Sequence, residues 1–223
     1  MGPVNIPVWA RDERKRRSTL SREAIVRAAI AIADAEDLDA VSIRRVAADL
    51  GARAMSIYTY IERKEDLLAL MGDEVAAEVI VPGELPADWR EATLAIARRE
   101  RAAVQRHPWM IDLAARRSQA GQIGPRMLQH LEQSIAALDT LDADDTLKYK
   151  LIAAVSDYTT GFVIREARER AQREVAEIDA YLQQVAASGE FPHLAKMLGS
   201  GPPTMEDNNF EQGLVWILDG LGA

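Results

Sequence analysis

The sequence of 223 residues has no cysteine, only three histidines and no long hydrophobic run. Without cysteine it can form neither a disulfide nor a cysteine-ligated metal site. The histidines, His107, His130 and His193, lack the spacing of metal ligands, so we expect no metal. The N-terminus lacks the apolar core of a secretion signal, and no eighteen apolar residues follow one another without a charge. We therefore expect a soluble cytoplasmic protein with no membrane span.

Positive charge is scarce overall and unevenly distributed. The net charge is −8, with 27 Lys and Arg against 35 Asp and Glu. Residues 11–65 carry 12 basic and 10 acidic side chains, or +2, which leaves 15 basic and 25 acidic, or −10, for the remainder. This asymmetry suits an N-terminal segment that meets a polyanion and an acidic body that does not. The basic run RKRR at 14–17 is more typical of a solvated tail than of a binding arm.

The apolar residues recur at helical spacing, with no convincing alternating strand and no internal repeat, which predicts an all-α fold. In LSREAIVRAAIAIADAEDLDAV, one helical face is apolar and Ser21 is placed to cap the N-terminus. The apolar positions of that face are Ile25, Ala28, Ala29 and Ile32. A second helix, IRRVAADLG, is predicted to begin after Ser42 and to end at Gly51, which can adopt the left-handed conformation.

The next stretch, AMSIYTYIERK, is short and polar but has two isoleucines four residues apart. Ile57 and Ile61 can therefore pack on the preceding helices, and this packing must hold a helix of seven or eight residues that would be marginal alone. The side chains left facing outward are Met55, Ser56, Thr59 and Tyr60, with Tyr58 at the flank. The spacing of a small residue, a glycine and an aliphatic at Ala47, Gly51 and Ile57 follows the packing of a helix-turn-helix.

Residues 20–80 resemble the DNA-binding domain of the TetR family of bacterial transcriptional regulators. The resemblance is carried by VSIRRVAADLG, SIYTYI and RKEDLLALM, in the order and spacing typical of that family. It implies a three-helix DNA-binding domain at 18–66 with its helix-turn-helix at about 42–62, a connecting helix at 67–80, and a helical effector-binding and dimerisation domain at 85–223. The Pro/Gly loop VIVPGELPAD supports a boundary near that point.

The resemblance also implies which side chains meet a double-stranded DNA operator. Those facing the major groove are Ser42, Arg44, Ala54, Met55, Ser56, Thr59 and Tyr60. Tyr58 and Lys64 match positions that hold phosphates, and Arg45 and Arg53 are added from their charge. Arg44 is the best candidate for a guanine, because its planar fork matches O6 and N7. Lys64 stands beside a helix start, where its ammonium and backbone N–H groups can meet one phosphate.

The C-terminal part is predicted to serve a different purpose. AAVSDYTTGFVIREA and FEQGLVWILDGL are similar to the two segments with which tetracycline repressors build a four-helix dimer interface, which implies a homodimer. Two copies related by a twofold axis would read half-sites about one helical turn, ~34–36 Å, apart. The terminal stripe consists of Phe210, Leu214, Ile217, Leu218 and Leu221. From composition alone this stripe completes the core or meets a second subunit.

A pocket for a small-molecule effector is expected in this body. Its candidate lining residues are Trp109, Met110, Met127, His130, Asp157, Tyr158, Phe162 and Arg165. Each apolar candidate is individually more often a plain core residue. The chain also departs from the tetracycline repressors, because Ala114 replaces an expected histidine, and Asp157 and Arg165 replace a histidine and a glutamate on the long helix. A magnesium–tetracycline inducer is therefore not expected.

These patterns favour a repressor that an effector releases from a palindromic operator by shifting the connecting helix. An alternative is a DNA-binding regulator without a small-molecule ligand. A third, an all-helical enzyme, is disfavoured because the sequence shows no nucleophile–base pair, phosphate loop, metal cluster or nucleotide fingerprint. We therefore expect no catalytic residues and no cofactor.

Overall fold

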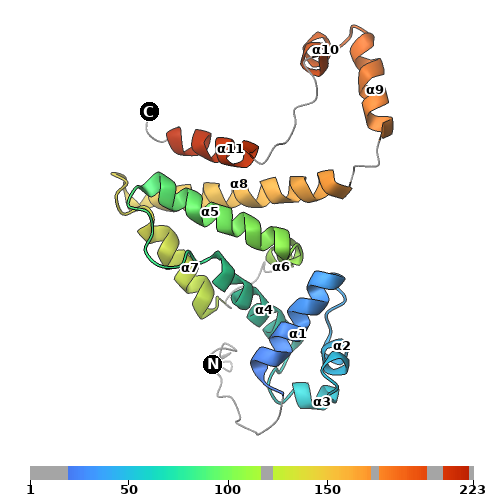
Figure 1. Ribbon diagram of the computed structural model, residues 1–223, viewed down its shortest axis with the longest axis vertical. Helices are drawn as coiled ribbons and strands as arrows, with labels where there is room; N and C mark the ends of the chain where they lie inside the picture. The colour runs from blue at the N-terminus through green and yellow to red at the C-terminus, as the bar shows by residue number, and fades with distance from the viewer. Residues whose placement is uncertain (1–19, 117–122, 172–175, 200–207, 221–223) are drawn as a thin grey trace, which may run out of the picture. The chain divides into compact units, whose positions relative to one another are not determined.

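The computed structural model describes residues 20–116, 123–171, 176–199 and 208–220, and these residues form α-helices joined by turns and loops, without a strand. The predicted all-α fold is confirmed (Figure 1). The helices are α1 (Arg22–Ala35), α2 (Ile43–Asp49), α3 (Ala54–Ile57), α4 (Lys64–Val79), α5 (Trp89–Arg106), α6 (Trp109–Arg116), α7 (Pro125–Ala136), α8 (Asp145–Ala171), α9 (Ala176–Ala187), α10 (Pro192–Gly199) and α11 (Asn208–Asp219). The chain divides into two compact units, Met1–Thr160 and Gly161–Ala223.

The start and end of the first two helices follow the predicted capping chemistry. The Ser21 hydroxyl accepts from the Ala24 N–H at 3.2 Å, and the Ser42 hydroxyl accepts from the Arg45 N–H at the same distance. Helix α2 ends before Gly51, whose φ of 61° lies in the left-handed region that glycine adopts without strain. The N–H of Ala52 then donates to the Ala47 carbonyl at 2.8 Å, which closes the turn.

One continuous hydrophobic core joins the first four helices to parts of α5 and α6. Its members on α1 include Ile25 and Ile32, as predicted, and it extends to Ala103, Trp109 and Leu113. The helix-turn-helix therefore rests on the same core as the end of α5 and the helix α6. The proposed boundaries at 18–66, 67–80 and 85–223 stay a prediction.

A buried carboxylate ties α4 to the start of α7. Asp73, which is 4% exposed, accepts from the backbone N–H groups of Arg126 and Met127 at 3.0 and 3.1 Å. Gly124, the N-cap residue of α7, has no side chain to do this. A Cβ on Gly124 would overlap the Asp73 carboxylate, so only glycine fits there. Asp73 thus caps a helix that lies about fifty residues away in sequence.

The loop between α4 and α5 is also attached to α7. The Gln133 side chain accepts from the Val81 N–H at 2.8 Å and donates to the Val81 carbonyl at 2.9 Å. Nearby, Ala92 and Ile96 of α5 pack with Ala137 in a small second core. These contacts place α5 and α7 beside each other.

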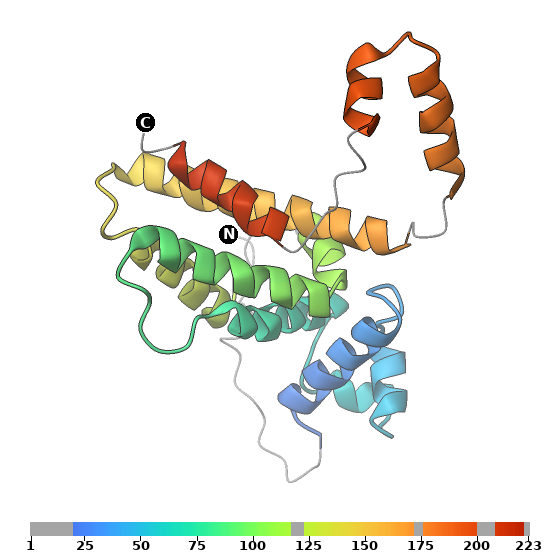
Figure 2. The same ribbon diagram turned by 45° about the horizontal axis from the view of Figure 1, so that its top comes forward.

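The second unit contains the end of α8 and helices α9 to α11. Phe162 and Phe210 meet edge to face, with ring centroids 5.1 Å apart, and both are buried. Leu214 and Leu218 of the predicted terminal stripe are buried, Ile217 is half-buried, and Leu221 lies outside the described residues. Helices α9 and α10 pack against each other (Figure 2), as a helical hairpin. The basic run at 14–17 is also outside the described residues.

Candidate functional site

The predicted DNA-reading side chains lie around a very short helix. Helix α3 spans only Ala54–Ile57 rather than the predicted seven or eight residues. A tight turn continues the chain, with the N–H groups of Tyr60 and Ile61 both donating to the Ile57 carbonyl, at 2.9 and 3.0 Å. Ile57 and Ile61 are fully buried, as expected. Because so short a helix is not stable alone, these two side chains hold it in place.

Most of the predicted reading residues are accessible from outside. Met55 is 76% exposed, and Ser56, Thr59 and Arg44 are exposed as well. Tyr58, the predicted phosphate-binding residue, is 45% exposed.

Four of the reading candidates are less accessible or already engaged. Tyr60 and Ala54 are half-buried and pack against the core, so the prediction that Tyr60 faces outward is only partly right. Ser42 uses its hydroxyl to cap α2, and the Arg45 guanidinium lies 2.7 Å from the Glu36 carboxylate. Arg44, by contrast, is an exposed guanidinium on the same helix. The DNA-contacting roles of these residues stay predictions.

The N-terminus of α4 adjoins this surface. Lys64 is the first residue of α4 rather than the residue just before it, and the side chain of Arg63 makes no capping hydrogen bond. Instead the Arg63 guanidinium meets the fully buried Asp66 at 3.0 Å. This hydrogen bond and the charge of Asp66 raise the pKa of Arg63 above its usual value. The geometry leaves Lys64 beside a helix start of the kind that binds phosphate.

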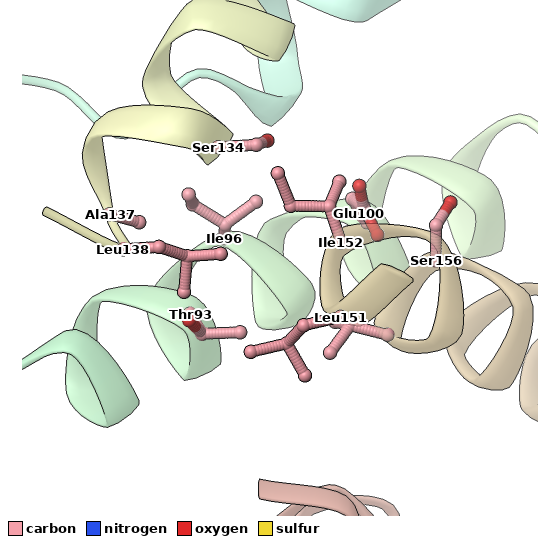
Figure 3. A pocket seen from close by; sticks show the side chains of 10 residues that line it. Thr93, Ile96, Glu100, Ser134, Ala137, Leu138, Leu151, Ile152 and Ser156 are labelled. Atoms are coloured by element: carbon pink, nitrogen blue, oxygen red, sulfur yellow. The ribbon is translucent and has the colours of Figure 1, made fainter. Parts of the chain in front are cut away.

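A pocket lies between α5, α7 and α8, entirely within the first unit (Figure 3). Its lining residues are Thr93, Ile96, Glu100, Ser134, Ala137, Leu138, Leu151, Ile152, Val155 and Ser156. Six of these ten are apolar, and Glu100 is the single ionisable group among them.

None of the eight predicted ligand residues lines this pocket. His130 comes nearest, because its Nε2 lies 3.0 Å from Oε1 of the lining residue Glu100. The sequence reading missed Glu100, although Thr93, Ile96 and Glu100 share one face of a helix at spacings of three and four. The sequence alone shows this face of α5, but it does not show which residues of α7 and α8 pack opposite it.

The other predicted ligand residues serve local packing or face outward. Met110 packs on the first core, and the Met127 backbone N–H donates to Asp73. Asp157 is exposed and Tyr158 half-buried. In the second unit, the Arg165 guanidinium stacks 4.7 Å above the Phe162 ring. None of these observations tests a role in ligand binding.

Trp109, another predicted ligand residue, takes part in a polar joint between α1, α4 and the α5–α6 corner. One carboxylate oxygen of Asp34 accepts from Trp109 Nε1 at 2.6 Å and from His107 Nδ1 at 2.7 Å. The other ring nitrogen of His107 lies 3.3 Å from a carboxylate oxygen of Glu78, which also pairs with Arg106. His107 is 4% exposed, whereas its carboxylate partners Asp34 and Glu78 remain partly accessible, at 31% and 36% of their side chains. The joint connects α1 and α4 to the end of α5, a helix that also contributes to the pocket.

Among the described helices, none is both long and apolar enough to cross a membrane.

Comparison with known proteins adds the family. Residues 81–223 match the model of the tetracyclin repressor-like C-terminal domain. The chain is 34% identical to the HTH-type transcriptional repressor DrrR1 of Streptomyces coeruleorubidus, over 95% of this chain and 80% of that protein. It is 32% identical to an HTH-type transcriptional regulator of Saccharopolyspora erythraea, over 97% of this chain and 91% of that protein.

A solved structure agrees with this assignment. The TetR family protein ActR of Streptomyces coelicolor, in complex with actinorhodin, superimposes with a TM-score of 0.77 and 29% identity, over 92% of this chain and 96% of ActR. The exposed side chains around α3, the helix-turn-helix beneath them and the matched C-terminal domain thus describe one kind of protein. The chain belongs to the TetR family of helix-turn-helix, DNA-binding transcriptional regulators.

Proposed function

We propose that this protein represses transcription from a palindromic operator and is released from it by a small molecule that binds the pocket between α5, α7 and α8. The observation that carries the DNA-binding part is the presentation of exposed polar side chains by α2 and α3 above fully buried isoleucines. A short helix of this kind can insert its exposed side chains into a DNA groove without unfolding, because the buried isoleucines that hold it lie on its opposite side.

The contacts divide into two kinds by chemistry. Arg44, Met55, Ser56 and Thr59 are assigned to base edges, where the guanidinium fork suits guanine and the apolar groups suit thymine methyls. Tyr58 and Lys64 are assigned to phosphates, with the backbone N–H groups at the start of α4 supporting Lys64. Arg45 is a weaker candidate, because its guanidinium is held by Glu36.

Homodimerisation is part of the proposal. One short helix reads few base pairs, whereas two copies read half-sites about one helical turn, ~34–36 Å, apart. The family match to residues 81–223 and the exposed Trp216 on α11, at 69%, support a second copy as partner. The domain assignment follows the same proposal, with DNA reading at 18–66, a connecting helix at 67–80 and effector binding and dimerisation at 85–223.

The release step is supported by the structure of ActR with actinorhodin and by the polar joints that tie α4 to the body. A ligand that changes the arrangement of α5 and α7 acts on α4 through Asp73 and Glu78. Only a ligand that binds the DNA-incompetent state more tightly than the DNA-binding state can release the protein from its operator. Bound DNA must then lower the affinity for that ligand by the same factor.

Selection of bound fragments from random DNA tests the DNA-binding part. We expect a palindromic consensus, and failure to enrich any sequence contradicts the proposal. On that consensus, Arg44→Ala relaxes the preference at one base position, at a cost of about 1–3 kcal/mol. Lys64→Ala weakens binding to all sequences alike and lowers the salt slope by about 1. Equal behaviour of the two variants in a salt titration contradicts the division of roles.

A further inference from the structure

We infer that the pocket binds a lipophilic cation, an apolar molecule carrying a protonated amine that pairs with Glu100. This inference rests on the proposed function and deepens it, because it names the chemical class of the effector. It follows from the carboxylate in the lining, the direction of the hydroxyl groups and the aliphatic side chains around them.

Glu100 is the only ionisable side chain among the lining residues, and its side chain is only 17% exposed. In Figure 3, Glu100 lies beside Ile152, and further apolar side chains, Leu138 and Leu151, continue the lining. A carboxylate in such surroundings loses much of its hydration and gains free energy from a cation placed beside it.

His130 contacts Glu100 within the described part of the chain, with its Nε2 3.0 Å from Oε1 of the carboxylate. Because a carboxylate oxygen accepts, Nε2 donates in this contact. The Nδ1 of His130 is buried without a hydrogen-bond partner among the described residues. The contact engages one oxygen of the Glu100 carboxylate and orients it.

The hydroxyl groups of the pocket also favour a donor on the ligand. Thr93 donates its single proton to the Trp89 carbonyl at 2.7 Å, and Ser134 donates to the His130 carbonyl at 2.9 Å. Each hydroxyl therefore turns only lone pairs toward the pocket. With Glu100, three of the four polar lining residues are acceptors, and Ser156 is the one left to serve as either. A ligand carboxylate would meet repulsion and no basic group, whereas an ammonium meets complementary partners.

The remaining lining residues define the rest of the ligand. Ile96, Leu138, Leu151 and Val155, with Ala137 and Ile152, offer aliphatic contacts. The pocket thus matches a small hydrophobic body with one cationic group.

The test uses two probes of equal shape and opposite charge, 1-naphthylmethylamine and 1-naphthoic acid, titrated calorimetrically into the full-length protein. We expect the amine to bind at least about tenfold more tightly than the acid. Glu100→Gln retains an acceptor for His130 and removes only the charge. We therefore expect this variant to bind the amine about tenfold more weakly, and to show a smaller ratio of amine affinity to acid affinity. Glu100→Asp should restore part of the preference, which a loss of folding would not.

The control is Glu91→Gln, which removes an exposed carboxylate from the same helix outside the pocket and should leave the ratio unchanged. Three results overturn the inference: no binding of the amine, equal or tighter binding of the acid, or an amine-to-acid ratio that Glu100→Gln does not change. Operator binding is measured in the same samples. If the amine binds through Glu100 but leaves operator affinity unchanged, the ligand class is supported and the proposed release is contradicted. If an acid releases the operator and Glu100→Gln does not change this, the release is supported and the ligand class is contradicted.

Discussion

The reading surface and the pocket lie in the same compact unit but are built in opposite ways. The reading side chains stand outside a four-residue helix, and the stabilising contacts of that helix lie underneath it. The pocket is enclosed by three long helices, and two of its hydroxyl groups are turned to their own backbone. In the proposed function, the reading surface exposes donors to a polyanion, whereas the pocket encloses acceptors.

The charge of the chain is divided in the same sense. Arg44 and Lys64 belong to the reading side, whereas the pocket contains the carboxylate of Glu100. A net charge of −8 is therefore compatible with DNA binding, because Arg44 and Lys64 lie on the proposed DNA-facing side and the acidic excess lies outside residues 11–65. Between the two sites stand two polar joints, at Asp34 and at Asp73.

The largest expected effect comes from removing the anchor of the reading helix. Ile57→Ala should lower the free energy of unfolding by about 2–5 kcal/mol, because a fully buried side chain is truncated, and should abolish operator binding. Urea denaturation and a DNA-binding assay measure the two effects. Met55→Ala, which truncates a side chain that is 76% exposed, should change stability by less than about 0.5 kcal/mol. If both variants have equal stability, the isoleucine is not the anchor.

The next effect concerns the joint between α4 and α7. Gly124→Ala should destabilise the protein by about 1–3 kcal/mol, because the new Cβ displaces the Asp73 carboxylate from the N–H groups that it caps. Gly161→Ala is the matched control, since nothing beyond the adjoining backbone of its own helix lies within 4 Å of the Cβ that it adds. Thermal denaturation compares the two. Equal melting temperatures would show that displacing the Asp73 carboxylate from α7 does not lower the stability of the protein.

A smaller effect is expected at the joint of α1 with the α5–α6 corner. Trp109→Phe keeps an aromatic ring and removes the N–H that donates to Asp34, which should cost about 1 kcal/mol of stability. If the joint couples the two sites, the same variant also reduces the factor by which a bound effector weakens operator affinity. Operator titrations with and without effector measure this factor. If the effector weakens operator affinity by the same factor in the variant, Trp109 contributes to stability only.

The smallest effect depends on pH. A hydrogen bond from its own backbone N–H, and then one from Ser21, lower the pKa of Glu23 below 4.5. Because the folded pKa is the lower one, the stabilisation is present above about pH 4.5 and is lost as the pH falls through the folded value. Glu23→Gln should therefore cost a few tenths of a kcal/mol at pH 7, and this cost should shrink toward pH 3. Denaturation at both pH values checks the sign, and an equal cost at both contradicts it.

Much of the reading element could be predicted because its determinants are local. Ser21 and Ser42 lie three residues before the N–H groups that they cap, and Gly51 is needed by one turn. Pro108, which stands between α5 and α6, is a local signal of the same kind, because a proline cannot continue a helix. The length of α3 and the half-burial of Tyr60 were not, because packing against the core decides where so short a helix ends.

The pocket was predicted to exist, but its residues were not identified. Trp109 looked like a ligand-binding aromatic and instead donates to Asp34, seventy-five residues earlier in the chain. The capping of α7 by Asp73 and the bond between Glu100 and His130 are likewise contacts between separate helices. A one-dimensional pattern shows which face of a helix is apolar but not which other face it meets.

By itself, the sequence determined the helical fold, the caps, the glycine turn and the apolar anchors of the reading element, because these depend on residues within a few positions of one another. Only the tertiary structure decided which side chains enclose the pocket and that its single charge is a carboxylate oriented by a histidine. Those groups come from helices spread between Thr93 and Ser156, and their approach is governed by the packing of whole helices rather than by local chemistry.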